Sequence, residues 1–576
     1  MKARHQRADG PRQAAGLMQA TFTPSCSALR FTMLAAVLLI AFPLSPASGQ
    51  QPSPDLILFN GRIFTSNASR PYVEALAILG ERISAVGTSK EIIALARKDT
   101  QRIDLAGRTV IPGINDAHDH LVVGPKSYEL PIKNIDPAWK EITEALSSAV
   151  ATIPKDTWIT ATFGATVLDD PEATRVVLDR LAPDNPVMLT DLAWHASLLN
   201  TRAFQKLGIR EDESNPNGGL WVRNPTNGRL SGMAFEFARF DVARRFSELG
   251  TEEEAEQQLS QFFGRAARWG ITTVQDMANP ITQRRCADLL ANAPPPIRVR
   301  IIWFGLTDQR GRLTNENRAA SMHAVPLVNV SGTKWILDGT PIERSAAMRR
   351  PYTDGPDTSG TLDFSEKEIE DILRQSLQNR EQLMLHVVGD RTTEVVLDVM
   401  DATGGKNVWA KRRVRIEHGD GITPDLMPRV RELGLVVVEN PTHLALPDLL
   451  TKRFGAARAA QLQPLRSLLD AGIPIAIGSD GPNNPYLNIM LAALDPGRPK
   501  EAITREQAVI AYTQGSAYAE FTEKGKGTLE NGKVADLAVL SQDIFHVPLN
   551  DLPKTESVLT RVGGKVVYDA KVLEGR

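Results

Sequence analysis

Short apolar runs typical of buried strands alternate with helical stretches through the middle of the chain, over residues 112–525. Val395 and Val399, for example, recur at helical spacing in a helix predicted to begin near Asp390. Such alternation is typical of βα units around a parallel sheet. Eight units form a (β/α)8 barrel of about 250 residues. The segment is longer than that, so we place an insertion at about 125–260, between the first and second barrel strands.

Both ends of the mature chain, residues 50–111 and 526–576, show short alternating strands bounded by turn residues instead. Each end alone is too small to form an independent β core. We therefore predict one small composite β-sandwich formed by both ends, with the barrel domain at 112–525 inserted between them. The predicted fold class is α/β, a (β/α)8 TIM-type barrel with this sandwich.

Residues 1–49 have the parts of a secretory signal peptide. Arg30 precedes an apolar run at 31–42, and small residues at 45–49 precede Gln50. The run is short for a bilayer span. We therefore predict cleavage near Gln50 and a periplasmic or secreted protein, with an uncleaved membrane anchor as the alternative.

Charge and cysteine content narrow the classes of partner. The formal net charge of −2 gives no support for nucleic-acid or membrane-surface binding. The two cysteines, Cys26 and Cys286, can build neither a disulfide framework nor a cysteine-type zinc site, and Cys26 leaves with the leader. The expected partner is a small-molecule substrate, with no nucleic acid and no stable membrane anchor after cleavage; homo-oligomerisation is left open.

The stretch 110–117 is interpreted as a buried β-strand that leads directly into His118 and His120. Alternate side chains of a strand share a face, so these two histidines project together while Asp119 points the other way. Two imidazoles on one face suit a divalent transition metal such as zinc. Two exposed histidines on an edge strand would give the same pattern, so this motif alone leaves both interpretations open.

Further polar residues follow apolar runs later in the chain. They are Lys334, His386, His418 and Asp480. The carboxyl ends of barrel strands meet at one mouth, which is where barrel enzymes keep their sites. We assign these residues to strands 4, 5, 6 and 8, and the histidine pair to strand 1.

This ordered set, HxH, Lys, His, His and Asp on successive strands, resembles the amidohydrolase superfamily. The sequence motifs at 441–444, 478–482 and 532–537 are most similar to those of its family 3 branch. The resemblance covers about residues 54–570. It implies a metal site of one or two divalent ions, with Zn²⁺ as the first candidate. The implied ligands are His118, His120, Lys334, His386, His418 and Asp480. In the binuclear members Lys334 would be an N6-carboxylysine that bridges two metals.

The chemistry that this resemblance implies is hydrolysis. A bound metal lowers the pKa of water and polarises a carbonyl, and Asp480 would be the general base. His443 or His195 would stabilise the oxyanion. We predict an exported metal-dependent amidohydrolase that cleaves a non-peptide or N-acyl C–N bond. The alternatives are an esterase, lactonase or phosphoesterase on the same fold, or a non-catalytic binding module.

Several assignments have a structural alternative. His195 is either a substrate contact or a core histidine beside Trp194, and Glu236 is either in contact with substrate or structural. Lys334 is either carboxylated or a plain lysine paired with Asp276 or Asp338. Arg344 either binds a substrate carboxylate or forms an ion pair with Asp354 or Asp338. Three residues are expected to orient ligating histidines rather than to bind metal: Asp390, Arg391 and Glu417.

Overall fold

The computed structural model describes residues 53–313 and 325–573. The predicted leader, with Cys26 and the expected cleavage site near Gln50, lies outside the described residues. Within the described residues, no helix has the length and apolar character needed to cross a membrane.

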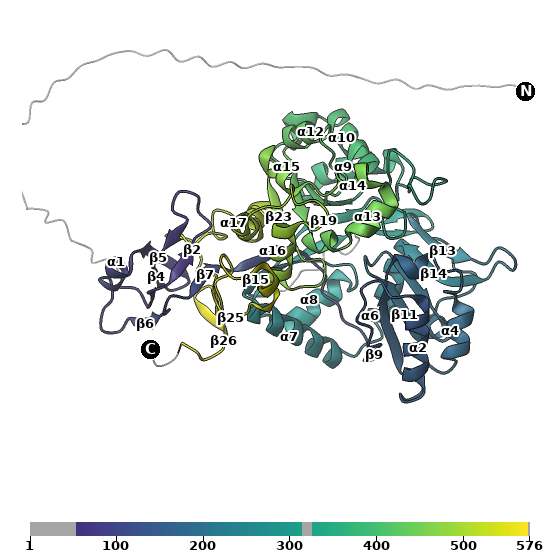
Figure 1. Ribbon diagram of the computed structural model, residues 1–576, viewed down its shortest axis with the longest axis horizontal. Helices are drawn as coiled ribbons and strands as arrows, with labels where there is room; N and C mark the ends of the chain where they lie inside the picture. The colour runs from purple at the N-terminus through teal and green to yellow at the C-terminus, as the bar shows by residue number, and fades with distance from the viewer. Residues whose placement is uncertain (1–52, 314–324, 574–576) are drawn as a thin grey trace, which may run out of the picture. The chain divides into compact units, whose positions relative to one another are not determined.

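Eight parallel strands form a nearly closed barrel, so the predicted fold class is confirmed (Figure 1). The first and last strands are not paired in a ladder, but the backbone N–H of Asp480 donates to the carbonyl of His118 across this seam at 2.9 Å. In chain order the strands are β8 (Ile114–Asp119), β15 (Ile271–Met277), β16 (Arg298–Phe304), β19 (Val328–Ile336), β20 (Leu383–Val387), β21 (Arg415–His418), β22 (Val436–Glu439) and β23 (Ile475–Ile477).

Helices that follow these strands in the chain cover the outside of the barrel (Figure 1). The helix predicted to begin near Asp390 is α10 (Asp390–Ala402). The capping box of Thr251 and Glu254 begins α7 (Glu252–Arg268), where the acidic first turn complements the helix dipole. The others include α8 (Gln283–Asn292), α9 (Glu366–Asn379), α12 (Met427–Glu432), α15 (Leu465–Asp470), α16 (Pro485–Leu494) and α17 (Arg505–Ile510).

Strands from both ends of the chain form one mixed sheet, as predicted. Its order is β26 (Lys565–Asp569), β25 (Ser557–Val562), β24 (Leu537–Leu540), β7 (Thr109–Pro112), β2 (Arg62–Phe64) and β3 (Tyr72–Val73). A four-stranded sheet from the N-terminal part packs on it, with the order β5 (Arg82–Gly87), β4 (Ala75–Leu79), β1 (Leu56–Phe59) and β6 (Gln101–Asp104). Leu58, Val110 and Leu537 belong to one buried cluster, so the two ends of the chain share a core, beside a smaller cluster formed by the N-terminal part alone.

A second six-stranded sheet comes between β8 and β15 in the chain. Its order is β13 (Gly219–Arg223), β14 (Leu230–Glu236), β12 (Ala196–Leu199), β11 (Val187–Asp191), β10 (Trp158–Phe163) and β9 (Ser127–Glu129). Helices α2 (Trp139–Val150) and α4 (Arg175–Leu181) pack on it around a separate core (Figure 1). The sequence patterns did not predict this sheet, and α6 (Phe237–Ser247) connects it back toward the barrel.

Candidate active site

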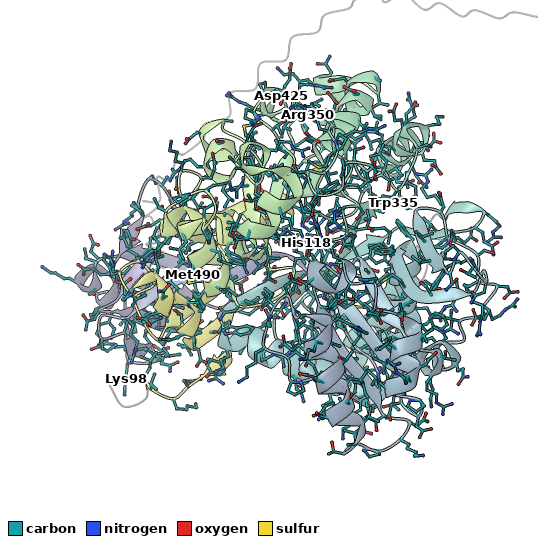
Figure 2. All side chains as sticks on the ribbon, turned by 45° about the vertical axis from the view of Figure 1, so that its right-hand side comes forward. Lys98, His118, Trp335, Arg350, Asp425 and Met490 are labelled. Atoms are coloured by element: carbon teal, nitrogen blue, oxygen red, sulfur yellow. The ribbon has the colours of Figure 1, made fainter. Side chains whose placement is uncertain are left out.

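His118 is buried in the interior of the molecule at the end of β8 (Figure 2). Its Nδ1–H donates to Glu417 Oε2 at 2.7 Å. Arg415 clamps the same carboxylate through Nε and Nη2, at 2.7 and 2.9 Å. The bond to Glu417 fixes the tautomer of His118 and leaves Nε2 with a free lone pair. Because burial lowers the pKa of His118 to about 4, the ring is neutral near pH 7 and can bind a cation.

His120 and His418 are oriented in the same way by groups behind them. The Nδ1–H of His120 donates to the carbonyl of Met277 at 2.8 Å, and its Nε2 lies 3.3 Å from Asp480 Oδ1. The Nδ1–H of His418 donates to Asn440 Oδ1 at 2.8 Å. His418 Nδ1 is also 3.8 Å from Asp480 Oδ2, but Asn440 uses its proton. Nε2 is therefore the ligand atom that we assign to both rings.

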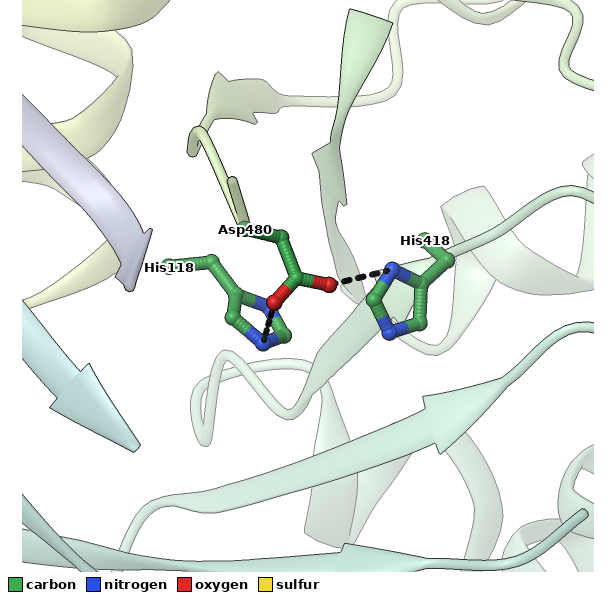
Figure 3. Close-up of side chains that lie close together, drawn as sticks. All are labelled: His118, His418 and Asp480. Atoms are coloured by element: carbon green, nitrogen blue, oxygen red, sulfur yellow. Dashed lines mark ion pairs between the residues drawn. The ribbon is translucent and has the colours of Figure 1, made fainter. Parts of the chain in front are cut away.

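Asp480 follows β23 and lies beside two histidines, His118 of β8 across the seam of the barrel and His418 of β21 (Figure 3). One ligand atom each from His118, His418 and Asp480 lies within 4.8 Å of the other two. Although burial alone would raise the pKa of Asp480, His118 and the other facing histidines hold it well below its usual range. The carboxylate is therefore ionised and available to a cation or a proton.

Lys334 lies at the end of β19, buried, with Nζ 3.2 Å from His118 Nε2. Burial lowers its pKa to about 8. The two carboxylates expected as its alternative partners, Asp276 and Asp338, bind other groups. Asp276 accepts from the backbone N–H of Leu121, and Asp338 accepts from backbone N–H groups and from Thr392. Lys334 therefore faces the histidine cluster rather than an acidic residue.

His386, from β20, completes the cluster. Its ring centroid is 4.4 Å from that of His418. Burial lowers its pKa well below the usual value, and its Nε2 is buried without a hydrogen-bond partner among the described residues. A buried ring nitrogen without a partner is costly unless something else binds it. Neutral imidazoles with a carboxylate form a donor set that suits Zn²⁺, so these residues fit a divalent metal.

A cavity of about 350 Å³ opens above this cluster, and both expected oxyanion donors line it. His195 donates from Nδ1 to Glu236 Oε2 at 2.6 Å, and its ring is 4.7 Å from that of His386. Burial would lower the pKa of His195, but the Glu236 carboxylate raises it overall. His443, on the 3-10 turn η2 (Pro441–Ala445), stacks on His418 with ring centroids 5.2 Å apart.

Arg344 and Asp390, which were expected near the site, contact other groups. Arg344 pairs with Asp354, one of its two expected ion-pair partners, and also with Asp169 at 2.6 Å. Asp390 accepts from the backbone N–H of Arg349 rather than from a ligating histidine. Glu417, by contrast, does orient His118, as expected.

Other residues that shape the site were not identified from the sequence. Asn440 directly follows β22, but Glu439, the last residue of that strand, stands between it and the apolar run, so an apolar-run pattern marks Glu439 before Asn440. Asp116 accepts from the backbone N–H groups of Ser479 and His118 and ties the two ends of the barrel together. Arg415 stands among apolar residues within a buried strand, and no sequence signal separates it from an exposed arginine.

An eight-stranded barrel whose mouth gathers histidines, a lysine and an aspartate defines a metal-dependent hydrolase. The model of the amidohydrolase family (Amidohydro_3) matches residues 101–568. The chain therefore belongs to amidohydrolase family 3.

Known proteins resemble the chain over most of its length. It is 28% identical to Protein LONG AFTER FAR-RED 3 of Arabidopsis thaliana, over 89% of this chain and 91% of that protein. It is 25% identical to the N-substituted formamide deformylase of Arthrobacter pascens, over 89% and 98% of the two chains. A metal-dependent hydrolase from Pyrococcus horikoshii OT3 has the same fold, with a TM-score of 0.66 and 21% identity over 86% and 99% of the two chains.

Proposed function

We propose that this protein hydrolyses the C–N bond of a small, non-peptide amide with a divalent metal, Zn²⁺ as the first candidate. The observation that carries the proposal is the cluster of buried, neutral histidines around Asp480, in which His386 Nε2 has no hydrogen-bond partner within the described part of the chain. The ligands that we propose are His118, His120, Lys334, His386, His418 and Asp480. The similarity to an N-substituted formamide deformylase supports an amide, and formamides in particular, as substrate.

When bound, the metal supplies Lewis-acid polarisation of the carbonyl and lowers the pKa of water at the site. Asp480, with its Oδ1 3.3 Å from His120 Nε2, accepts a proton from the attacking water and returns it to the leaving amine. Because Glu236 raises the pKa of His195, the ring can carry a proton on both nitrogens: Nδ1–H donates to Glu236, and Nε2–H then donates to the substrate oxygen. His443 lines the same cavity as a second donor.

The test is a substrate panel on metal-stripped and zinc-reconstituted protein. We expect amine release from N-alkylformamides and N-alkylacetamides only after reconstitution with Zn²⁺ or another divalent ion. Hydrolysis of matched esters, lactones or phosphoesters with no amine release from amides would replace the proposal by a different hydrolase. Protein that takes up no zinc, manganese or cobalt would favour a binding module.

Replacing Lys334 with alanine should remove most bound metal and most activity. The reason is that a neutral lysine adds carbon dioxide and loses a proton, and the carbamate then offers two oxygens to metal. Short carboxylates added with metal should partly restore both in the Lys334→Ala protein. Metal content by elemental analysis and turnover are the two measurements. Full metal content without any added carboxylate would exclude a bridging role for Lys334.

Export is proposed from the sequence of residues 1–49. Mature protein recovered from the periplasm or the medium should begin near Gln50, as read by N-terminal sequencing. A full-length chain confined to the cytosol would contradict export, and it would leave the proposed chemistry untouched.

A further inference from the structure

The wall of the active-site cavity away from the histidine cluster is apolar. Two segments that follow the seventh and eighth barrel strands contribute apolar residues to its lining, α13 (Pro447–Phe454) with the residue before it, and α16. Five leucines come from these segments, and we call them the leucine wall: Leu446, Leu449, Leu450, Leu487 and Leu491.

The inserted segment between β8 and β15 supplies apolar residues to the same cavity. Ile135 and Trp194 line it and are 48% and 38% exposed, although both are large apolar residues. Exposed apolar side chains gathered at a cavity mark a surface that an apolar ligand can cover. The leucine wall and these two residues together therefore give an apolar group of a ligand a surface against which it can pack.

Outside the histidines and the proposed metal site, the described lining of this cavity offers no cation to an anionic substituent. Apart from histidines, the charged residues among its described lining are Lys334, Asp420 and Asp480. Lys334 is buried against His118 Nε2, within the proposed metal site. The other two are carboxylates, which would repel a substrate carboxylate.

Three arginines near the cavity are already bound by carboxylates or lie behind an aromatic residue that lines it. Arg453 is buried and pairs with both Asp354 and Asp169, the two partners of Arg344. Arg239 is buried behind Trp194, with its guanidinium carbon 5.2 Å from the centre of the indole ring. None of these three arginines lines the cavity. A substrate carboxylate could recruit one of them only by breaking an existing pair or by moving Trp194.

We propose that the substrate is an uncharged amide with an apolar N-substituent, which packs against the leucine wall. The proposal rests on the proposed amide hydrolysis and adds the substrate class. Anionic N-acyl amino acids, which contain the same amide bond, are discriminated against. Binding of an apolar chain should strengthen with its length, by about fourfold per methylene while the chain lies on the wall.

The experiment compares two compounds that differ by one carboxylate, N-pentylformamide and N-formylnorleucine, on the zinc-loaded enzyme. We expect kcat/KM to favour N-pentylformamide by at least about 100-fold, and to rise along the series from N-methyl- to N-pentylformamide. Calorimetry measures the affinity for both compounds in parallel. Equal or better use of N-formylnorleucine, or a flat chain-length series, would overturn the proposal.

Variants of the wall give a second, independent readout. Leu449→Arg and Leu487→Arg, made separately, each introduce a counter-ion and should raise kcat/KM for N-formylnorleucine by about tenfold while lowering it for N-pentylformamide. Leu449→Gln, the uncharged control, should lower kcat/KM for N-pentylformamide without raising kcat/KM for N-formylnorleucine. If both arginine variants leave the substrate ratio unchanged in folded protein, the wall does not contact the substituent and the proposal fails.

The two proposals fail in different ways. If zinc-loaded enzyme hydrolyses neither compound, amide hydrolysis is in doubt, and the calorimetric affinities still decide the substrate class. Tighter binding of N-pentylformamide would support the apolar class, and tighter binding of N-formylnorleucine would overturn it. If both compounds are hydrolysed equally well, the amide chemistry stands and the substrate class is wrong.

Discussion

Replacing Asp480 with asparagine should lower kcat by about 10²-fold or more, with near-normal folding. Asparagine keeps the size of the side chain and one oxygen, but it cannot take the proton that Asp480 accepts from water. Circular dichroism melting and elemental analysis of the purified variant would separate loss of the base from loss of fold or metal.

Asp420→Asn is the matched control for this prediction. Asp420 lines the same cavity but lies 4.0 Å from His443 and makes no contact with the histidine pair of β8. We expect its loss to cost less than about tenfold, because it does not reach the attacking water. If Asp480→Asn keeps most of its activity, Asp480 is not the base; Glu417, the other candidate from the sequence, is fully bound by His118 and Arg415.

Replacing Glu417 with glutamine should lower metal affinity by about 10- to 100-fold, because His118 loses the carboxylate that fixes its tautomer and raises its basicity. The same change leaves the fully buried guanidinium of Arg415 without its charged partner. Removing one partner of a buried pair costs about 3–5 kcal/mol of unfolding free energy. Metal titration and denaturant unfolding of the variant measure the two effects separately.

Glu523→Gln is the matched control here. It also removes a carboxylate from an arginine, Arg413, at 2.8 Å, but both side chains of this pair are partly exposed. We expect a cost of about 1 kcal/mol or less and an unchanged metal affinity. Equal losses of stability in the two variants would contradict the argument that burial makes the Glu417 pair important.

The barrel and the cluster at its mouth could be predicted because both follow from local patterns. Barrel strands contain short apolar runs, and polar residues near the carboxyl end of a strand lie at the mouth of the barrel. This pattern brought together His118, His386, His418 and Asp480, which come from four different strands. It does not separate Asn440 from Glu439, the residue that ends β22.

The second sheet could not be predicted in the same way. Its strands β12 and β14 pair across more than thirty residues of sequence, as Ala196 opposite Phe235 shows. Pairing at this distance depends on which strands can bury a common face and not on the pattern within one strand. The sequence therefore indicated the room for an insertion but not its architecture.

The charged residues show most clearly what the sequence determined and what only the tertiary structure decided. The sequence determined which residue types stand at the ends of the barrel strands, because strand periodicity is a property of neighbouring residues. Only the tertiary structure decided their partners: Arg344 meets Asp169, 175 positions away, and His118 meets Glu417, 299 positions away. A charge in a poorly hydrated interior must be paired, and its partner is whichever group the fold brings within a few ångströms. For this reason an arginine that could have held a substrate carboxylate became part of an ion-pair network, and the cavity beside it is left with an apolar wall.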